Sequence, residues 1–512
     1  MRRKKVIMFI IDSFHPQVLD DVTADGSAPA LSFLRKQGFS HSGVVSAFPT
    51  MTPTALSSIA TGTYADKHKV PGFIWLSEIS HWLVNYGATP GSILKLGVFQ
   101  SVKNLLYGLN QEHVSPLVKT VHEALEERGY SSGNINFFIY RGRKRREAKV
   151  PWLVRLAAWL RLQGGPILGP ESLALGEFCL SPSLKNFRGP VGLFNKFGFN
   201  DRFSCLAARE LIKRGKQPDF MMVYLPDNDR FSHRVGPMNT HPCIREADKL
   251  IQYVLDAFPS WEHALEHNAI LVAGDHSQCQ IVKKHNLIRL DRALQKFTQV
   301  SMLSGRVRSR DDVAICPNER MAIIYVLKNP GEILPRIVDA FIGEDRISQI
   351  MWKEHDHYRV IEGGTGRSLT FWRGDIPTDG TSEHRTDEFA LRPVVVVDQY
   401  GQRWGYEGDL AVIDGRLDGE VLRFGEYPDA LARIASALDC QRTPRVLLSA
   451  RPGYEFYGEE APIFPGGGSH GSLHQSDSLV PALIAGSDYD LASPRIIEFY
   501  NWLMKQLPER RW

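Results

Sequence analysis

The stretch KVIMFII, residues 5–11, is followed directly by Asp12 near the start of the chain. After its lysine the stretch is a continuous run of apolar residues, several of them β-branched. Such a run is typical of a parallel strand with both faces buried, because a half-exposed strand would alternate apolar and polar residues. The pattern therefore predicts a central strand at 5–11, with Asp12 at its carboxyl end.

Two later stretches repeat this arrangement. FMMVYL at 220–225 and AILVA at 269–273 are also continuous apolar runs, and acidic or histidine residues follow each of them within a few positions. Helical patterns occur at 30–36, 119–128 and 243–258. Alternating strands and helices predict an α/β fold with a mainly parallel sheet. Such sheets bind ligands beyond the carboxyl ends of their strands, so this edge is the expected site.

The chain has 512 residues, which is long for a single core and predicts a main domain with substantial insertions. A basic segment that contains tryptophans interrupts the alternation at 80–200. A second segment at 285–450 holds short strand patterns, such as 321–327 and 393–397, among many turn signals. We interpret both segments as caps, the first of them as a lid. The predicted core then consists of residues 1–80, 200–285 and 450–512.

Charge and composition narrow the class of protein. The chain has 61 Lys and Arg against 57 Asp and Glu, and the resulting net charge of +4 is too small to indicate nucleic acid as a partner. The basic start reaches Asp12 without a signal-peptide apolar region, and no apolar run is long enough to span a membrane. The six cysteines lack CxxC spacing, which suits a reducing compartment. Together these features predict a cytoplasmic protein.

A threonine-rich segment, FPTMTPTALSSIATG at 48–62, predicts the start of a helix. Residues 55–60 suit a helix, Pro53 suits its first position, and Thr52 is then expected as the N-cap. The hydroxyl of Thr52 would face the positive end of the helix dipole and free backbone N–H groups, which favour an alkoxide and a bound phosphate. For an isolated threonine, a purely structural cap is the commoner role.

Acidic and histidine residues recur after the predicted strands: Asp12, Asp229 with His233, Asp275 with His276, and finally His470 after a triple glycine. Asp229 and His233 are one helical turn apart, close enough to share an ion. Mixed Asp and His ligands suit zinc, and manganese is an alternative. Any single pair is also common in a hydrogen-bonded turn, whereas four groups in this order indicate a metal centre.

Together these motifs resemble the type I phosphodiesterase and nucleotide pyrophosphatase branch of the alkaline phosphatase superfamily. Members carry an Asp after the first strand, a Pro-Thr-x-Thr segment ending in Thr-Gly, an Asp-x-x-x-His-x-x-Gly-Pro segment, a Ser/Gly-Asp-His segment and a late His-Gly. The corresponding residues here are Asp12; Pro49 to Gly62; Asp229, His233, Gly236 and Pro237; Gly274, Asp275 and His276; and His470 with Gly471. The resemblance implies an alkaline-phosphatase-like three-layer sandwich with a mainly parallel central sheet and inserted caps.

The resemblance also implies a metal-dependent hydrolase of phosphodiesters or pyrophosphates that acts on a small phosphorylated substrate. It implies two divalent metal ions, one held by Asp12, Thr52, Asp275 and His276 and the other by Asp229, His233 and His470. It further implies that Thr52 attacks phosphorus in line and forms a phosphothreonine intermediate, which is then hydrolysed. Thr50 and Thr54 are rival nucleophiles, and the position of Thr61-Gly62 favours Thr52.

The family's pattern is not matched at every position. Nucleotide-cleaving relatives place a phosphate-holding Asn near the position of Phe73, which weakens the case for a nucleotide substrate. Lys69 stands where the family has a glycine and offers positive charge, although an exposed lysine is more often simply solvated. His474 lies four residues after His470, one turn away if the segment is helical. Lys69, Phe73 and His474 are therefore candidate substrate contacts, with a structural role as the stronger alternative for His474.

Two alternative functions stay open. One is phosphomonoesterase or phosphonate hydrolase activity on the same metals, because these activities differ in the pocket around the phosphate. The other is a non-catalytic protein that binds membrane surfaces through segment 141–162. In that segment a basic run at 141–146 precedes an apolar face at 150–162. This pattern fits an interfacial helix on an anionic membrane, and it also fits a cap helix packed on the core, which is the commoner arrangement.

Overall fold

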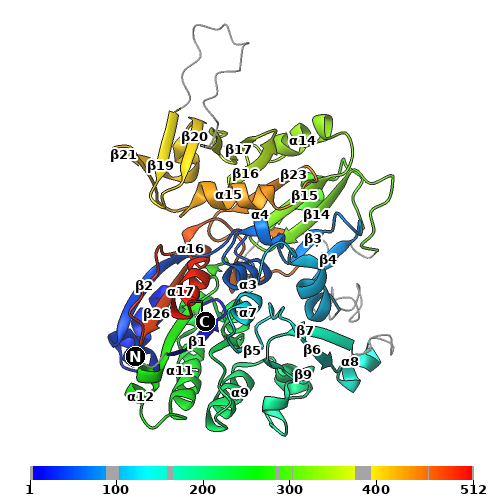
Figure 1. The fold of residues 1–512 in the computed structure, drawn as a ribbon. Helices are drawn as coiled ribbons and strands as arrows, with labels where there is room; N and C mark the ends of the chain where they lie inside the picture. Colours follow the sequence, from blue (N-terminus) through cyan, green and yellow to red (C-terminus); the bar gives the residue numbers. More distant parts are fainter. Residues whose placement is uncertain are drawn as a thin grey trace.

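The computed structural model describes residues 4–87, 103–157, 165–282, 287–301, 304–374, 394–458 and 461–509. Two sheets dominate these residues, and they lie one above the other in Figure 1. The first sheet is built around β1 (Lys5–Ile11) and the second begins at β14 (Val313–Asn318). None of the described helices is both long enough and apolar enough to cross a membrane.

The first sheet has eight strands among the described residues, with β1 in an interior position. In spatial order they are β2 (Gly38–Val45), β26 (Leu479–Ala485), β11 (Asn268–Gly274), β1, β10 (Phe220–Leu225), β5 (Ser132–Ile135), β8 (Ser172–Leu175) and β9 (Cys179–Leu180). β1 pairs in parallel with β10 and β11, so that Ile11 lies level with Leu225 and Gly274. The three expected strands are thus confirmed, and their carboxyl ends meet at one edge.

Helices cover both faces of the first sheet (Figure 1). The residues of β1 from Val6 to Ile11 are at most 1% exposed, and alternate residues join two different hydrophobic clusters. One cluster includes α1 (Pro16–Ala24), α2 (Pro29–Lys36), α9 (Asp201–Lys213), α11 (His241–Leu255) and α12 (Trp261–His267). The other includes α3 (Thr52–Thr61), α7 (Val121–Glu127) and α17 (Glu498–Gln506). The predicted α/β class and the expected helices near 30–36, 119–128 and 243–258 are confirmed.

The second sheet has ten strands among the described residues and falls almost wholly within 285–450. In spatial order they are β14, β15 (Met321–Val326), β23 (Arg445–Ala450), β16 (Ile347–Glu354), β17 (His357–Glu362), β18 (Ser368–Arg373), β20 (Arg403–Gly408), β19 (Val394–Asp398), β22 (Val421–Phe424) and β21 (Gly415–Asp418). α14 (Pro330–Asp339) packs on one face and α15 (Ala430–Asp439) on the other. The α15 side shares a hydrophobic cluster with α3, so one core connects the two sheets.

Shorter elements join the layers. They are α4 (Ala65–His68), β3 (Ile74–Leu76), β4 (Leu83–Asn85), η1 (Asn104–His113), η2 (Pro182–Leu184), η3 (Leu193–Gly198), α10 (Asp227–Val235), η4 (Pro237–Asn239), β12 (Cys279–Gln280), β13 (Leu287–Arg289), α13 (Leu290–Ala293), η5 (Leu410–Ile413), β24 (Glu455–Tyr457), β25 (Gly468–Ser469) and α16 (Gln475–Ser478). β12 pairs with β25, which ties the loop after β11 to the loop that carries His470.

The prediction that 80–200 is wholly an insertion is wrong, because β5, β8 and β9 come from this segment and extend the first sheet. β5 (SGNI) and β8 (SLAL) are only four residues long and contain polar residues. Neither shows the long apolar run that marked β1, since each contributes only a short stretch of backbone pairing to the sheet. The lid is therefore smaller than the sequence predicted.

One part of that segment does lie outside the first sheet. β6 (Lys144–Ala148) pairs with β7 (Gly165–Gly169), and α8 (Trp152–Ala157) lies between them in the chain. Residues 158–162 of the predicted amphipathic helix fall outside the described residues. Trp152 and Leu156 are 70% and 58% exposed, whereas Val154 is buried. α8 thus packs inward through Val154 and leaves two large apolar side chains on the surface.

A buried ion pair joins the second sheet to the loops of the first. The guanidinium of Arg320, in the turn between β14 and β15, contacts the carboxylate of Asp477, and both side chains are fully buried. Asp477 also accepts a hydrogen bond from the backbone N–H of Ser472 at 2.8 Å. The backbone N–H of Arg320 donates to the carbonyl of His470 at 2.9 Å. The pair thereby holds the β14–β15 turn against the loop that carries His470.

Asp477→Asn is expected to lower the free energy of unfolding by about 3–5 kcal/mol, because it leaves the buried guanidinium of Arg320 without its counter-charge. Urea denaturation followed by circular dichroism would measure the change. Glu332→Gln is the matched control, because the Arg336–Glu332 pair has side chains that are 50% and 66% exposed. That control should change stability by no more than about 1 kcal/mol. Equal effects of the two substitutions would contradict the proposed role of the pair.

Candidate metal centre

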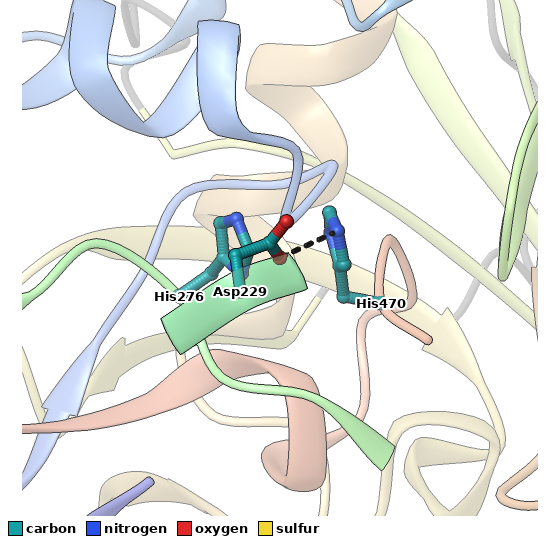
Figure 2. Close-up of side chains that lie close together, drawn as sticks. All are labelled: Asp229, His276 and His470. Carbon is teal, nitrogen blue, oxygen red and sulfur yellow. Dashed lines mark ion pairs between the residues drawn. The ribbon is translucent and has the colours of Figure 1, made fainter. Parts of the chain in front are cut away.

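Seven side chains singled out from the sequence converge where β1, β10 and β11 end. They are Asp12, directly after β1; Thr52, at the start of α3; Asp229 and His233, on α10; Asp275 and His276, directly after β11; and His470, directly after β25. Figure 2 shows three of them, Asp229, His276 and His470, close together. The parallel register of the three strands is what brings residues so distant in the sequence to one edge.

Asp12, Asp275 and His276 form one compact group with Thr52. His276 Nε2 lies 3.1 Å from Thr52 Oγ1. The same nitrogen is 3.4 Å from Asp12 Oδ1 and 3.7 Å from Asp275 Oδ2. All four side chains are buried. Ligand atoms of Asp12, Asp275 and His276 at these separations can bind one ion.

Asp229, His233 and His470 form a second group beside the first. Asp229 Oδ2 lies 3.3 Å from His233 Nε2, and the two residues are four apart on α10, as their spacing predicted. Asp229 Oδ1 lies 3.6 Å from His470 Nε2, the ion pair drawn in Figure 2. The imidazole rings of His470 and His276 stack with their centroids 4.0 Å apart, so the two groups are adjacent.

Hydrogen bonds orient the groups of the second set. His233 Nδ1 donates to the carbonyl of Gly468 at 2.8 Å, and His470 Nδ1 donates to the carbonyl of Thr50 at 2.7 Å. Each bond fixes the ring and leaves the lone pair of Nε2 directed at the site. Ser13 Oγ and Gln278 Nε2 both donate to Asp229 Oδ1, each at 2.7 Å.

Burial and crowding of negative charge perturb the first group. Desolvation raises the pKa of Asp12 well above its usual range, and repulsion from Asp275 and Asp229 raises it further. Desolvation also raises the pKa of Asp275 to about 7. Burial, together with the nearby His470, lowers the pKa of His276. The low-dielectric surroundings therefore disfavour charge on each of these groups unless an opposite charge is present.

In the second group, attraction between opposite charges outweighs the effect of desolvation on the pKa values. Burial alone would raise the pKa of Asp229, but attraction to His233 and His470 outweighs it and holds the pKa below its usual value. Burial alone would lower the pKa of His233, yet the carboxylates of Asp229 and Glu319 raise it to about 9. In the absence of a metal ion, protonated His233 thus supplies part of the positive charge that the carboxylates need.

The chemistry of these residues suits the binding of divalent metal ions. Asp12 Oδ1 and Asp275 Oδ2 are buried, and neither has a hydrogen-bond partner among the described residues. A buried carboxylate oxygen without a partner is costly, and a coordinated cation removes that cost. Carboxylate and inward-facing imidazole donors are the ligands that zinc and related ions prefer. The structure thus brings together all seven residues expected as ligands.

Thr52 differs by one position from its expected place in the helix. It is the first residue of α3, and Met51 takes the N-cap position instead. The reason is that the carbonyl of Met51 accepts the first helical hydrogen bond, from the N–H of Ala55 at 2.9 Å. Thr52 still lies at the positive end of the α3 dipole, and its hydroxyl contacts His276.

The hydroxyls of the rival threonines bond to backbone groups and not to the ligand side chains. Thr50 Oγ1 donates to the carbonyl of Ser472 at 3.1 Å. Thr54 Oγ1 donates to the carbonyl of Val70 at 3.2 Å. Neither residue lines the pocket beside Thr52.

A pocket of about 380 Å³ opens beside Thr52. Apolar side chains form much of its wall: Met51, Phe73, Ile74, Pro317, Pro462 and Phe464. Phe73, one of the expected substrate contacts, therefore faces the site. The side-chain oxygen of Asn318 accepts hydrogen bonds from the backbone N–H groups of Phe73 and Ile74, at 2.6 and 3.0 Å. Asn318 thus fixes the start of β3 in the pocket wall.

The structure does not place Lys69 or His474 in this pocket. Lys69 is the C-cap of α4 and lines a different pocket, where its ammonium group donates to the carbonyl of Asp439 at 3.1 Å. His474 is the N-cap of α16, and its Nδ1 accepts a hydrogen bond from the N–H of Ser476 at 3.1 Å. The suggested helical turn between His470 and His474 is absent, because α16 begins only at Gln475. Neither residue therefore lines the pocket beside Thr52, and their roles as substrate contacts stay predictions.

Sequence reasoning missed one acidic residue at the site. Glu319 lies in the turn between β14 and β15, and its Oε2 is 3.5 Å from His470 Nε2. It follows no strand of the first sheet and belongs to no motif, so neither spacing nor resemblance marked it. Only the packing of the second sheet on the first brings Glu319 to the ligands.

Comparisons with known proteins identify the family and the fold of the chain. A sequence model of the family described as type I phosphodiesterase / nucleotide pyrophosphatase matches residues 6–473. No curated protein matches the chain at a significant level of sequence similarity. Murine ectonucleotide pyrophosphatase / phosphodiesterase 5 has a similar solved structure, with a TM-score of 0.55 and 13% identity over 99% of this chain and 96% of its own. The human protein of the same name gives a TM-score of 0.56 and 13% identity at the same coverages.

A further solved structure of the murine protein is described as an inactive Thr→Ala variant in complex with AMP. It matches with a TM-score of 0.55 and 12% identity over 99% of this chain and 96% of its own. At such identities these structures establish a shared fold, and the alkaline-phosphatase-like architecture is thereby confirmed.

Removal of metal should make the stability of the protein fall as pH rises. Without a cation, folded Asp275 titrates at about 7 and His233 at about 9, both above their values in an unfolded chain. At these two groups the folded state then binds more protons than the unfolded state between about pH 7 and pH 9, where the histidines of the unfolded chain are already neutral, so the free energy of unfolding decreases across that range. Thermal unfolding of chelator-treated protein in a pH series would measure this decrease.

Added Zn²⁺ should reverse the loss, because metal binding displaces these protons and becomes tighter as pH rises. The increase in Tm caused by Zn²⁺ is therefore expected to be larger at pH 8 than at pH 5. An increase that is the same at both values, or no increase at all, would contradict the proposed linkage.

Proposed function

Because the chain is a phosphoric ester hydrolase of the metal-dependent type I phosphodiesterase / nucleotide pyrophosphatase family, we propose that it cleaves phosphodiesters through a phosphothreonine intermediate on Thr52. The observation that carries this proposal is the position of Thr52. Its hydroxyl lies 3.1 Å from His276 Nε2, and the residue also lines the pocket beside both ligand groups. The inactive Thr→Ala variant of the murine relative supports a central role for a threonine.

In this proposal two divalent ions bind the seven ligands. Asp12, Thr52, Asp275 and His276 would hold one ion, and Asp229, His233 and His470 would hold the other. Zinc suits this donor set best, with manganese as the alternative. Ions bound there would supply the positive charge that lowers the pKa of the Thr52 hydroxyl and neutralises the phosphate oxygens.

Thr52 carries the covalent chemistry. Once its hydroxyl has lost its proton to solvent, Oγ1 forms a bond to phosphorus while the bond to the leaving oxygen breaks on the opposite side, and the leaving alcohol takes a proton from solvent. Water then attacks phosphorus, the bond from Oγ1 breaks, and Thr52 regains a proton. The positive end of α3 favours the negative charge that accumulates beside Thr52 in both steps.

The pocket supports a diester as the preferred substrate. Its volume of about 380 Å³ exceeds what a phosphate group alone requires. The side chains of Phe73, Ile74 and Phe464 in its wall suit an apolar or aromatic ester group. Arg230 and Arg234 also line the pocket, and their positive charge favours a monoester or phosphonate as the second candidate.

Thr52→Ala is expected to lower kcat by roughly 10⁴-fold or more, because it removes the nucleophile. Release of p-nitrophenol from bis(p-nitrophenyl) phosphate would measure the loss, and p-nitrophenyl phosphate assayed in parallel would report monoester activity. Thr54→Val is the matched control. Thr54 lies in the same first turn of α3, and its hydroxyl donates to the backbone carbonyl of Val70, so this substitution should leave turnover largely intact.

Full diesterase activity of Thr52→Ala would overturn the nucleophile assignment. A strong preference of the unaltered protein for the monoester would instead favour the second candidate.

Phe73→Ala is expected to raise KM for the aryl diester about tenfold with a smaller effect on kcat, because the loss of an apolar contact weakens substrate binding. Steady-state kinetics with bis(p-nitrophenyl) phosphate would measure it. Phe194→Ala provides the control, since Phe194 is 99% exposed and does not line this pocket. An unchanged KM in Phe73→Ala would exclude Phe73 as a substrate contact.

A further inference from the structure

Glu319 is the acidic group at the metal centre that the proposed mechanism leaves unused. Its side chain is 5% exposed and comes from the second sheet, in the turn between β14 and β15. Oε2 of Glu319 lies 3.5 Å from His470 Nε2, and Oε1 lies 3.9 Å from His233 Nε2. The carboxylate therefore faces two expected ligands of the same ion.

Three of the four carboxylate-to-imidazole distances among these groups match the edges of one coordination shell, and the fourth, 3.9 Å between Glu319 and His233, is slightly longer. Asp229 lies 3.3 Å from His233 and 3.6 Å from His470, similar to the two distances that Glu319 makes. Four ligands that each sit about 2.0–2.2 Å from a tetrahedral zinc ion are roughly 3.3–3.6 Å from one another. The ligand atoms of His233, Glu319 and His470 also lie within 4.8 Å of one another. We propose that Glu319 is a fourth protein ligand of the ion held by Asp229, His233 and His470.

The backbone around Glu319 holds its carboxylate in this position. Glu319 has a φ of 58°, a left-handed conformation that non-glycine residues rarely adopt and that tends to occur at functional sites. Its carbonyl accepts a hydrogen bond from the N–H of Phe456 at 2.7 Å. Its Oε2 accepts hydrogen bonds from Ser469 Oγ at 3.1 Å and from the N–H of His470 at 3.2 Å. The strained turn is thus fixed from both sides, with the carboxylate directed at the imidazoles.

A fourth carboxylate changes the charge of the centre, and this inference rests on the proposed metal-dependent function. With Glu319 the site has four carboxylates, which balance two divalent ions, so less positive charge remains for the substrate. A monoanionic diester needs less of that charge than a dianionic monoester. Glu319 therefore favours the diester class that the apolar pocket wall also suits.

The alternative is that Glu319 only positions the loop of His470 through its two hydrogen bonds. Glu319→Gln distinguishes the roles, because the amide oxygen still accepts those hydrogen bonds but is a poor ligand. Glu319→Asp retains the charge and shortens the side chain by one methylene, so it tests whether reach matters. Glu455→Gln is the matched control, because Glu455 is also buried nearby but accepts a hydrogen bond from the N–H of Phe464.

The test is a Zn²⁺ titration of chelator-treated full-length protein against a chromophoric zinc chelator, with the increase in Tm as a second readout. The unaltered protein and Glu455→Gln should bind two ions tightly. Glu319→Gln and Glu319→Asp should bind one of the two ions about 10–100-fold more weakly, with the other affinity unchanged. Affinities in Glu319→Gln equal to those of the unaltered protein would overturn the assignment.

Neither readout depends on turnover, so the two proposals can fail separately. Two tight zinc sites in a protein that hydrolyses no phosphate ester would refute the proposed function and leave the Glu319 assignment intact. Normal hydrolysis together with undiminished zinc affinity in Glu319→Gln would refute only the Glu319 assignment.

Discussion

The rest of the site depends on the mutual repulsion of three carboxylates, Asp12, Asp229 and Asp275, which the parallel register of β1, β10 and β11 brings to one edge. Burial makes this repulsion costly, and desolvation together with repulsion raises the pKa of both Asp12 and Asp275. Imidazoles compensate Asp229, while Asp12 and Asp275 each keep a buried oxygen without a hydrogen-bond partner among the described residues. Strand register, which stabilises the fold, therefore also brings together carboxylates that a cation would neutralise, so that metal binding at this site would add to the free energy of folding.

The second sheet is more than a cover over this edge. Three consecutive residues in and beside its β14–β15 turn each contact a different part of the structure around the first sheet. Asn318 holds the backbone of Phe73 in the pocket wall, Glu319 faces His470, and Arg320 pairs with Asp477 on α16. One short turn thus contacts the pocket wall, a candidate metal ligand and the buried ion pair between the two sheets. A shift of the second sheet would alter all three together.

What the sequence could predict follows from where the stabilising contacts lie. β1, β10 and β11 are buried on both faces, so each shows an apolar run, and their ligands were found because they directly follow those runs. β5 and β8 are short strands with polar residues, so no such run marked them. The N-cap of α3 was misplaced by one residue because the backbone carbonyl of Met51 begins the helical bonding. Glu319 was missed because only tertiary packing brings it near the imidazoles.

The candidate ligands and the pocket wall come from different parts of the fold. The ligands of the first group, and Asp229 with His233, are fixed by strand ends of the first sheet, where a change would disturb fold and charge balance together. The pocket wall comes from elsewhere: Phe73 precedes β3, Pro317 is on β14, and Phe464 is in the loop before β25. These positions can change without moving a strand of the first sheet. Family membership therefore indicates phosphoric ester hydrolysis, while the pocket wall, with Phe73 near the position expected for a phosphate-holding Asn, is where we propose that substrate preference is set.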